Sequence, residues 1–173
     1  PADMALWAMV ETPLAMLQIQ DIARSPRLAC LVMGTSDLAK DLNAAHTPDR
    51  LPFMTGLGLC LLAARAYGLA ILDGVHLNLG DDEEFLAHCR QGYEMGFDGK
   101  TLIHPKQVEP ANASFGPSEA QVEEARRIIA AHAEAEAKGQ GVVLLDGKLI
   151  ENLHVAGAHR TVALAEAIVA LSA

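Results

Sequence analysis

The sequence contains little cysteine, an excess of acidic over basic residues, and no long hydrophobic run. Three dispersed cysteines argue against a disulfide framework, so each is expected to pack as a small apolar side chain in a reducing compartment, the cytoplasm. A net charge of −9 argues against a general nucleic-acid-binding surface. The most apolar stretch, 57–66, is far shorter than the roughly 20 residues of a membrane-spanning helix. The first residues have no basic segment or cleavage site, so no signal peptide is expected, and neither a membrane nor nucleic acid is expected as a partner.

Several widespread motifs are missing as well. No Gly-x-Gly-x-x-Gly or Gly-Lys-Ser/Thr sequence follows a predicted strand, which removes the usual marker of a dinucleotide or nucleoside-triphosphate site. No Gly-x-Ser-x-Gly elbow supplies a serine nucleophile, and no histidines have the His-Glu-x-x-His spacing of a zinc site. His104 precedes Pro105 at a strand end, where it is expected to orient a turn rather than act as a general base.

Short apolar runs alternate with helical patterns through the first two thirds of the chain. The runs are continuous rather than alternating, which indicates strands buried on both faces of a parallel sheet. The predicted strands are 5–10, 28–33, 69–72 and 100–103. The predicted helices are 14–23, 37–42, 52–67, 81–95 and 105–113. Two α/β architectures fit this pattern: an open doubly wound sheet, or part of a (β/α)8 barrel.

The pattern changes after Gly116. A long charged helix is expected from Ser118, its N-cap, to about residue 138. Apolar segments 142–145 and 148–150 flank Asp146-Gly147 and predict a hairpin. An amphipathic helix over 153–171 would follow, and it could pack on a neighbouring subunit.

Two acidic residues follow the first two predicted strands. Glu11 and Asp37 would lie at the carboxyl ends of adjacent parallel strands, which are about 4.8 Å apart. Two carboxylates that converge there favour a hard divalent cation, most simply Mg²⁺. Gly34-Thr35-Ser36 opens the helix beside them, and its free backbone N–H groups favour a carboxylate ligand.

Six motifs in this order resemble the HpcH/HpaI aldolase superfamily, in its citrate lyase β-subunit-like branch. That branch includes malyl-CoA, citramalyl-CoA and citryl-CoA lyases. The motifs are Val10-Glu11-Thr12-Pro13, Met33-Gly34-Thr35-Ser36-Asp37-Leu38, Leu72-Asp73-Gly74-Val75, Gly96 to Val108 with its Gly-Lys-x-x-Ile-His-Pro-x-Gln core, Phe115-Gly116-Pro117-Ser118, and Asp146-Gly147-Lys148-Leu149-Ile150-Glu151.

The resemblance implies a (β/α)8 TIM barrel with a C-terminal helical extension. Residues 1–116 would match strands five to eight as a partial barrel, and residues 117–173 the extension or lid. At 173 residues the chain is shorter than the roughly 200 or more of a closed barrel, so we expect a fragment or one piece of a split barrel. The family also implies a homo-oligomer, a trimer or hexamer.

The resemblance also assigns roles to particular residues. Glu11 and Asp37 match the family's Mg²⁺ ligands, with Mg²⁺ as the cofactor. The turn Gly34, Thr35, Ser36 and Asp37 matches the segment that binds the substrate carboxylate through backbone amides. Glu151 matches an acidic residue of the extension that transfers a proton, although the family's Met-Ile-Asp-x-Pro motif reads Leu149-Ile150-Glu151-Asn152-Leu153 here.

These residues predict an enzyme, a Mg²⁺-dependent carbon–carbon lyase that acts on acyl-CoA and small 2-oxo acids. Reversible cleavage of malyl-CoA into acetyl-CoA and glyoxylate is the leading expectation. The alternatives are citramalyl-CoA or citryl-CoA cleavage, malyl-CoA thioester hydrolysis, and a non-catalytic structural or CoA-binding subunit. An open-sheet binding domain of flavodoxin type is a further alternative.

Overall fold

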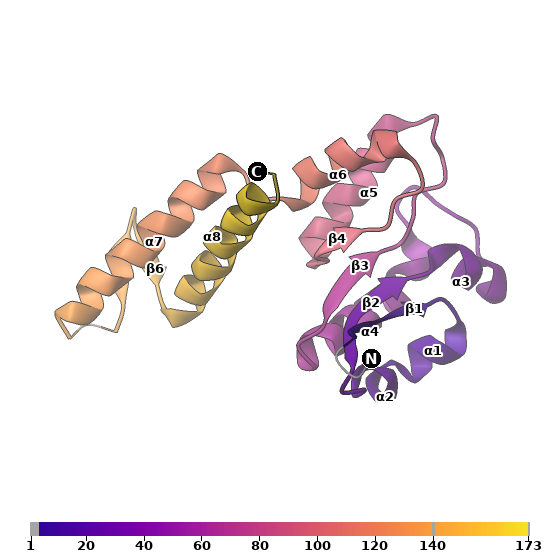
Figure 1. The fold of residues 1–173 in the computed structure, drawn as a ribbon, viewed down its shortest axis with the longest axis horizontal. Coiled ribbons are helices and arrows are strands. Elements are labelled where there is room, and N and C mark those ends of the chain that lie inside the picture. Colours follow the sequence, from indigo (N-terminus) through magenta and orange to yellow (C-terminus); the bar gives the residue numbers. More distant parts are fainter. Residues whose placement is uncertain (1–3, 140, 173) are drawn as a thin grey trace. The chain divides into compact units, whose positions relative to one another are not determined.

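The computed structural model describes residues 4–139 and 141–172, and it divides the chain into two units between Phe115 and Gly116 (Figure 1). The first unit alternates strands and helices. Its strands are β1 (Leu6–Val10), β2 (Leu28–Met33), β3 (Ala70–Asp73) and β4 (Gly99–Lys100). Its helices are α1 (Pro13–Leu17), α2 (Ile19–Ala23), α3 (Thr35–Leu42), α4 (Met54–Ala66), α5 (Asp82–Met95) and α6 (Val108–Phe115), with 3₁₀ turns at Leu51–Phe53 and Pro105–Gln107.

The four strands form one parallel sheet in the order β1-β2-β3-β4, so each strand pairs with the next one in the sequence. The predicted parallel α/β sheet is therefore confirmed. Its carboxyl ends are aligned, because Val10 is paired with Met33 and Val32 with Leu72. Residues that follow the strands therefore gather at one edge of the sheet.

The fourth strand is shorter than the predicted 100–103. Thr101 still donates its backbone N–H to the Asp73 carbonyl, at 3.0 Å. The N–H of Ile103 instead donates to the side-chain Oε1 of Gln107, at 3.1 Å. The backbone therefore leaves the sheet and enters the turn at His104-Pro105.

The helix predicted for 14–23 is two short helices. Thr12 caps α1, where its hydroxyl accepts from the Ala15 N–H at 3.2 Å, and Pro13 occupies the first turn. Gln18, with φ −103° and ψ 13°, leaves the helical conformation and separates α1 from α2. By contrast, the bounds of α5 are close to the predicted 81–95. Asp81 is its N-cap, and Gly96, with φ +102°, ends the helix.

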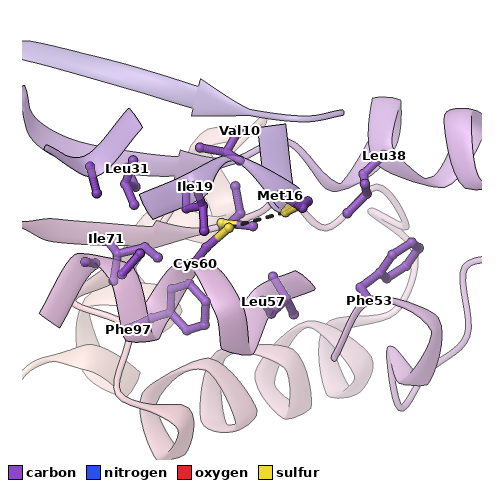
Figure 2. Packing of buried hydrophobic residues seen from close by; sticks show 14 of the residues in the cluster. Val10, Met16, Ile19, Leu31, Leu38, Phe53, Leu57, Cys60, Ile71 and Phe97 are labelled. Carbon is purple, nitrogen blue, oxygen red and sulfur yellow. Dashed lines mark hydrogen bonds between the residues drawn. The ribbon is translucent and has the colours of Figure 1, made fainter. Parts of the chain in front are cut away.

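The core of the first unit lies between the sheet and its helices (Figure 2). Leu31 and Ile71 of the sheet and Leu57 of α4 are fully buried. Cys60 Sγ lies 3.3 Å from Met16 Sδ in the same cluster. All three cysteines are free and buried, as expected of cysteines that pack as small apolar side chains.

Large apolar side chains remain exposed on β1, an edge strand of the described sheet. Trp7 is 66% exposed and Met9 is 54% exposed. Contiguous apolar surface of this kind usually marks an interface.

The second unit contains two long helices and a hairpin, α7 (Glu119–Ala137), β5 (Val143–Leu145), β6 (Lys148–Ile150) and α8 (Asn152–Ser172). Ser118 and Gln121 form a capping box at the start of α7. Asp146 and Gly147 both have positive φ, 50° and 78°, as a type I′ hairpin turn requires. The predicted antiparallel hairpin is confirmed. Among the described residues, no helix is both long and apolar enough to cross a membrane.

Candidate functional site

Glu11 lies directly against the turn that follows β2. The Gly34 N–H donates to the Val10 carbonyl at 2.9 Å, which continues the β1–β2 ladder to this point. A Cβ on residue 34 would lie 2.4 Å from Glu11 Cβ and 3.0 Å from its Oε2. Glycine is therefore required at position 34 by the close approach of the Glu11 side chain.

Asp37 lies in the first turn of α3, which begins at Thr35. The backbone N–H groups of this first turn have no acceptor within the helix. Gly34 is different, because its N–H is already donated to Val10. In the part of the chain that the structure describes, the buried Ser36 hydroxyl has no hydrogen-bond partner. The turn thus offers several polar groups beside Glu11.

A buried charge cluster lies at the carboxyl ends of β3 and β4, whose last residues are Asp73 and Lys100. Asp73 is fully buried and accepts from Arg50 Nη1, at 2.7 Å to Oδ1 and 2.6 Å to Oδ2. Lys100 Nζ lies 3.0 Å from Asp73 Oδ2 and also donates to the Gly74 carbonyl. Burial lowers the pKa of Lys100, and Arg50 acts in the same direction, whereas Asp73 opposes them. Through Arg50, the cluster connects the loop before α4 with β3 and β4.

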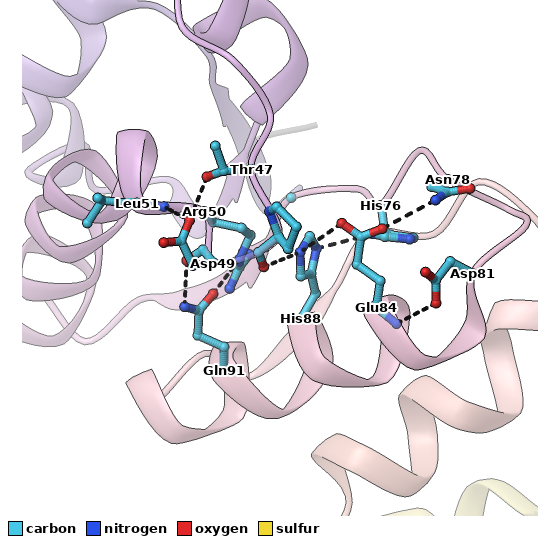
Figure 3. Close-up of polar contacts among 12 residues, drawn as sticks. Thr47, Asp49, Arg50, Leu51, His76, Asn78, Asp81, Glu84, His88 and Gln91 are labelled. Carbon is cyan, nitrogen blue, oxygen red and sulfur yellow. Dashed lines mark hydrogen bonds and ion pairs between the residues drawn. The ribbon is translucent and has the colours of Figure 1, made fainter.

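A second cluster, which we call the histidine cluster, comprises His76, Glu84 and His88 (Figure 3). His76 Nδ1 and His88 Nδ1 are 3.1 Å apart, and Glu84 Oε1 lies 3.9 Å from His88 Nε2. Burial lowers the pKa of His88 to about 4, and the positive charges of Arg50 and Lys100 contribute. His88 is therefore neutral at pH 7.

The histidine cluster lines a cavity of about 150 Å³. Thr35 of α3 and Arg50 also line it, so the cavity adjoins both the turn after β2 and the buried charge cluster.

Glu151 belongs to the second unit and immediately precedes α8. Its N–H donates to Nδ1 of His154, at 3.0 Å, so the His154 ring helps to cap the helix. The Glu151 side chain is exposed and makes no ion pair with the other described residues.

Sequence reasoning missed the two buried clusters. Arg50 lies between the predicted helices 37–42 and 52–67, and its left-handed backbone, at φ 55°, is not revealed by the sequence. The histidine cluster joins residues 12 positions apart, which no short motif describes. The i,i+4 spacing of Glu84 and His88 on a predicted helix is the signal that could have drawn attention to it.

The fold and the turn after β2 define a family of α/β enzymes. The family model for HpcH/HpaI aldolase/citrate lyase matches residues 1–105, and the chain belongs to this family. The resemblance inferred from the sequence is thereby confirmed.

Among the relatives, the chain is similar to a (3S)-malyl-CoA thioesterase of Cereibacter sphaeroides. The two are 58% identical over 171 residues, which cover 99% of this chain and 60% of that protein. It is also 39% identical, over 83% of its length, to citrate lyase subunit beta of Haemophilus influenzae, 50% of which is covered. The chain therefore spans between half and three fifths of these relatives.

A crystal structure of protein CitE from Mycobacterium tuberculosis, in complex with magnesium, acetoacetate and coenzyme A, has a similar fold. The TM-score is 0.79 at 26% identity, over 94% of this chain and 61% of that one.

The thioesterase relatives overturn the expectation of a carbon–carbon lyase and favour the hydrolytic alternative. The physical reason for the error lies in the motifs. The roles expected of Glu11, the turn at Gly34–Asp37 and Glu151 are to hold an acidic acyl-CoA and to move a proton. They do not specify whether the bond that breaks is carbon–carbon or carbon–sulfur.

Proposed function

We propose that this chain carries the metal-binding and proton-transfer residues of a (3S)-malyl-CoA thioesterase, which hydrolyses malyl-CoA to malate and CoA. The observation that carries the proposal is 58% identity to such an enzyme over 99% of the chain. The CitE structure, which holds coenzyme A and a small acid, supports a ligand of the same class.

Glu11 and Asp37 would hold Mg²⁺. The side-chain donors of these segments are oxygens: the Glu11 and Asp37 carboxylates and the Ser36 hydroxyl, which is buried and has no partner in the described ranges. Such a set fits Mg²⁺, which prefers oxygen ligands and retains several waters. The absence of a Cβ at residue 34 leaves space beside Glu11 that a larger residue would fill. A bound Mg²⁺ would supply positive charge that orients and polarises substrate oxygens.

The backbone of the turn would bind the free carboxylate of the malyl group. The N–H groups of Thr35, Ser36 and Asp37 are available at the start of α3, and the helix dipole favours an anion there. Gly34 would contribute space rather than a donor, since its N–H is donated to Val10.

Glu151 would act as the general base for hydrolysis. Its carboxylate would take a proton from the water whose oxygen attacks the thioester carbonyl carbon. The carbon–sulfur bond would then break, and the proton would pass to the departing CoA thiolate. An exposed carboxylate at the start of α8 is accessible for this role.

The four-stranded sheet would be half of a (β/α)8 barrel, strands five to eight. The sequential order of four parallel strands is that of a barrel wall, whereas a doubly wound sheet reverses its order at a switch point. The exposed apolar residues Trp7 and Met9 on edge strand β1 are consistent with further barrel strands beyond it. The homo-oligomer and the cytoplasmic location stay predictions.

The direct experiment follows the products formed from (3S)-malyl-CoA. Thioester hydrolysis releases a free CoA thiol and malate, and both are expected to require Mg²⁺. Removal of the metal by EDTA should abolish turnover, and added Mg²⁺ should restore it. Turnover that is unaffected by EDTA would exclude the roles given to Glu11 and Asp37.

A further inference from the structure

The histidine cluster has the features of a metal site made from different residues than the Mg²⁺ ligands proposed above. His76 lies three residues beyond the end of β3, while Glu84 and His88 lie one turn apart on α5. Each of the three side chains offers one ligand atom, and these three atoms all lie within 4.8 Å of one another. Both histidines are buried.

The separations are near those of a zinc site. Zn²⁺ binds nitrogen and oxygen ligands at about 2.0–2.2 Å in a tetrahedral arrangement, which places two ligand atoms about 3.2–3.6 Å apart. The two Nδ1 atoms of His76 and His88 are 3.1 Å apart. Glu84 Oε1 lies 3.9 Å from Nε2 of the His88 ring, and its ligand oxygen lies within 4.8 Å of the histidine ligand atoms, so the Glu84 side chain would have to move closer to complete the site.

A hydrogen bond determines which nitrogen of His88 can bind. Nε2 of His88 lies 3.0 Å from the Pro48 carbonyl oxygen. A carbonyl oxygen only accepts, so Nε2 carries the proton and the lone pair of the neutral ring is on Nδ1. An N–H donated to a backbone carbonyl is the usual outer partner of a metal-binding histidine. The lone pair of His88 Nδ1 therefore accepts the Nδ1–H of His76, at 3.1 Å, and a bound metal ion would take the place of that proton.

The His76 ring is enclosed, and the ring nitrogen that is not the proposed ligand atom has no partner among the described residues. This nitrogen is Nε2, and the His76 side chain is only 4% exposed. Buried polar atoms are rarely left unpartnered. The ring lines the cavity of about 150 Å³, which is large enough to hold a metal ion with a bound water.

We propose that His76, Glu84 and His88 bind a divalent transition-metal ion, best matched by Zn²⁺, with a fourth ligand position open to the cavity. Two imidazoles and one carboxylate suit Zn²⁺ rather than Mg²⁺, which prefers oxygen. Asp73 pairs with both Arg50 and Lys100 and so offsets part of their positive charge, and Glu84 would supply a negatively charged ligand. The ion would tie the loop after β3 to α5.

The test is a zinc titration of the chelator-stripped protein, performed with excess Mg²⁺ present and read through a chromophoric chelator competitor. We expect one equivalent of Zn²⁺ to bind, and Co²⁺ to give the visible absorption of a tetrahedral site. His88→Gln and Glu84→Gln should each weaken the affinity at least about tenfold. The matched control, Glu83→Gln, changes an exposed carboxylate on the same helix and should leave the affinity unchanged.

Two variants keep the test decisive if one of them fails to fold. Glu84 is half-buried, so its replacement can be assessed even where loss of the buried His88 destabilises the protein. The proposal is overturned if no stoichiometric Zn²⁺ binds, if Glu84→Gln and His88→Gln bind as wild type does, or if Glu11→Gln removes the zinc site instead. Because the readout is binding rather than hydrolysis, it is independent of the thioesterase proposal.

Discussion

Gly34 and Glu11 are packed so closely that residue 34 has no room for a side chain: an added Cβ would lie 2.4 Å from Glu11 Cβ. Gly34→Ala should therefore displace Glu11 or the turn before α3. We expect a loss of about 1–3 kcal/mol in the free energy of unfolding, together with at least about a tenfold loss of activity. Urea unfolding and the thiol-release assay measure the two effects.

Gly58→Ala is the matched control for that substitution. A Cβ there would meet nothing within 4 Å, and the residue lies inside α4. The substitution should stabilise the protein by about 0.5–1 kcal/mol, because alanine has the higher helix propensity. Equal destabilisation by both substitutions would show that Gly34 has no special role.

Asp73→Asn should be among the most damaging single substitutions outside the proposed reaction residues. It would leave Arg50 and Lys100 buried with no counter-charge, which costs about 3–5 kcal/mol. Asp82→Asn is the comparison, because the Asp82 side chain is 80% exposed and its pair with Lys106 should contribute less than about 1 kcal/mol. Denaturant midpoints of the two variants give the difference directly, and similar midpoints would contradict the account of the buried cluster.

The stability of the metal-free protein should fall as the pH drops from about 6.5 toward 4. His88 has a pKa of about 4 when folded and an ordinary value of 6.5 when unfolded, so the unfolded chain binds more protons in this window. The contribution of His88 is therefore complete above pH 6.5 and is lost progressively below it, by about 1–3 kcal/mol. His76, Glu84, Arg50 and Lys100 surround the ring and define its electrostatic environment.

Unfolding measured in urea across this pH range tests the prediction. The pH dependence should shrink in His88→Gln and persist in His159→Gln, which alters an exposed histidine of α8. A profile that His88→Gln leaves unchanged would assign the acid sensitivity to other groups.

Glu11→Gln and Asp37→Asn should each reduce turnover at least about 100-fold, because a bound metal contributes several kcal/mol of charge stabilisation. Asp41→Asn is the control, since Asp41 is exposed and lies on the same helix as Asp37. Turnover rates at saturating Mg²⁺ separate the three variants. Activity retained by both Glu11→Gln and Asp37→Asn would show that these carboxylates do not hold the metal.

The sequence predicted much of the fold because its local signals were strong. The apolar run 28–33 matches β2 at both ends, and Ser118 caps α7 as expected. Asp146-Gly147 forms its turn because both residues tolerate positive φ. Each of these elements is determined by neighbouring residues in the chain.

Features that depend on distant residues were not predictable in the same way. The end of β4 depends on a side-chain acceptor, Gln107, that takes the Ile103 N–H, and a pattern of apolar residues does not show such an acceptor. The apolar pattern likewise gives no sign of the break at Gln18. The Arg50–Asp73–Lys100 cluster joins three separate segments, and no pattern within any one segment indicates that the three residues meet. The adjacency of Glu11 and Gly34 was predictable, because aligned parallel strands bring residues at their ends together.

The most direct measurement is the identity of the products formed from (3S)-malyl-CoA with Mg²⁺ present. The account predicts free CoA and malate in equal amounts, with Glu151→Gln severely impaired and Glu134→Gln, an exposed carboxylate on α7, unimpaired. Formation of acetyl-CoA and glyoxylate in place of malate would contradict it.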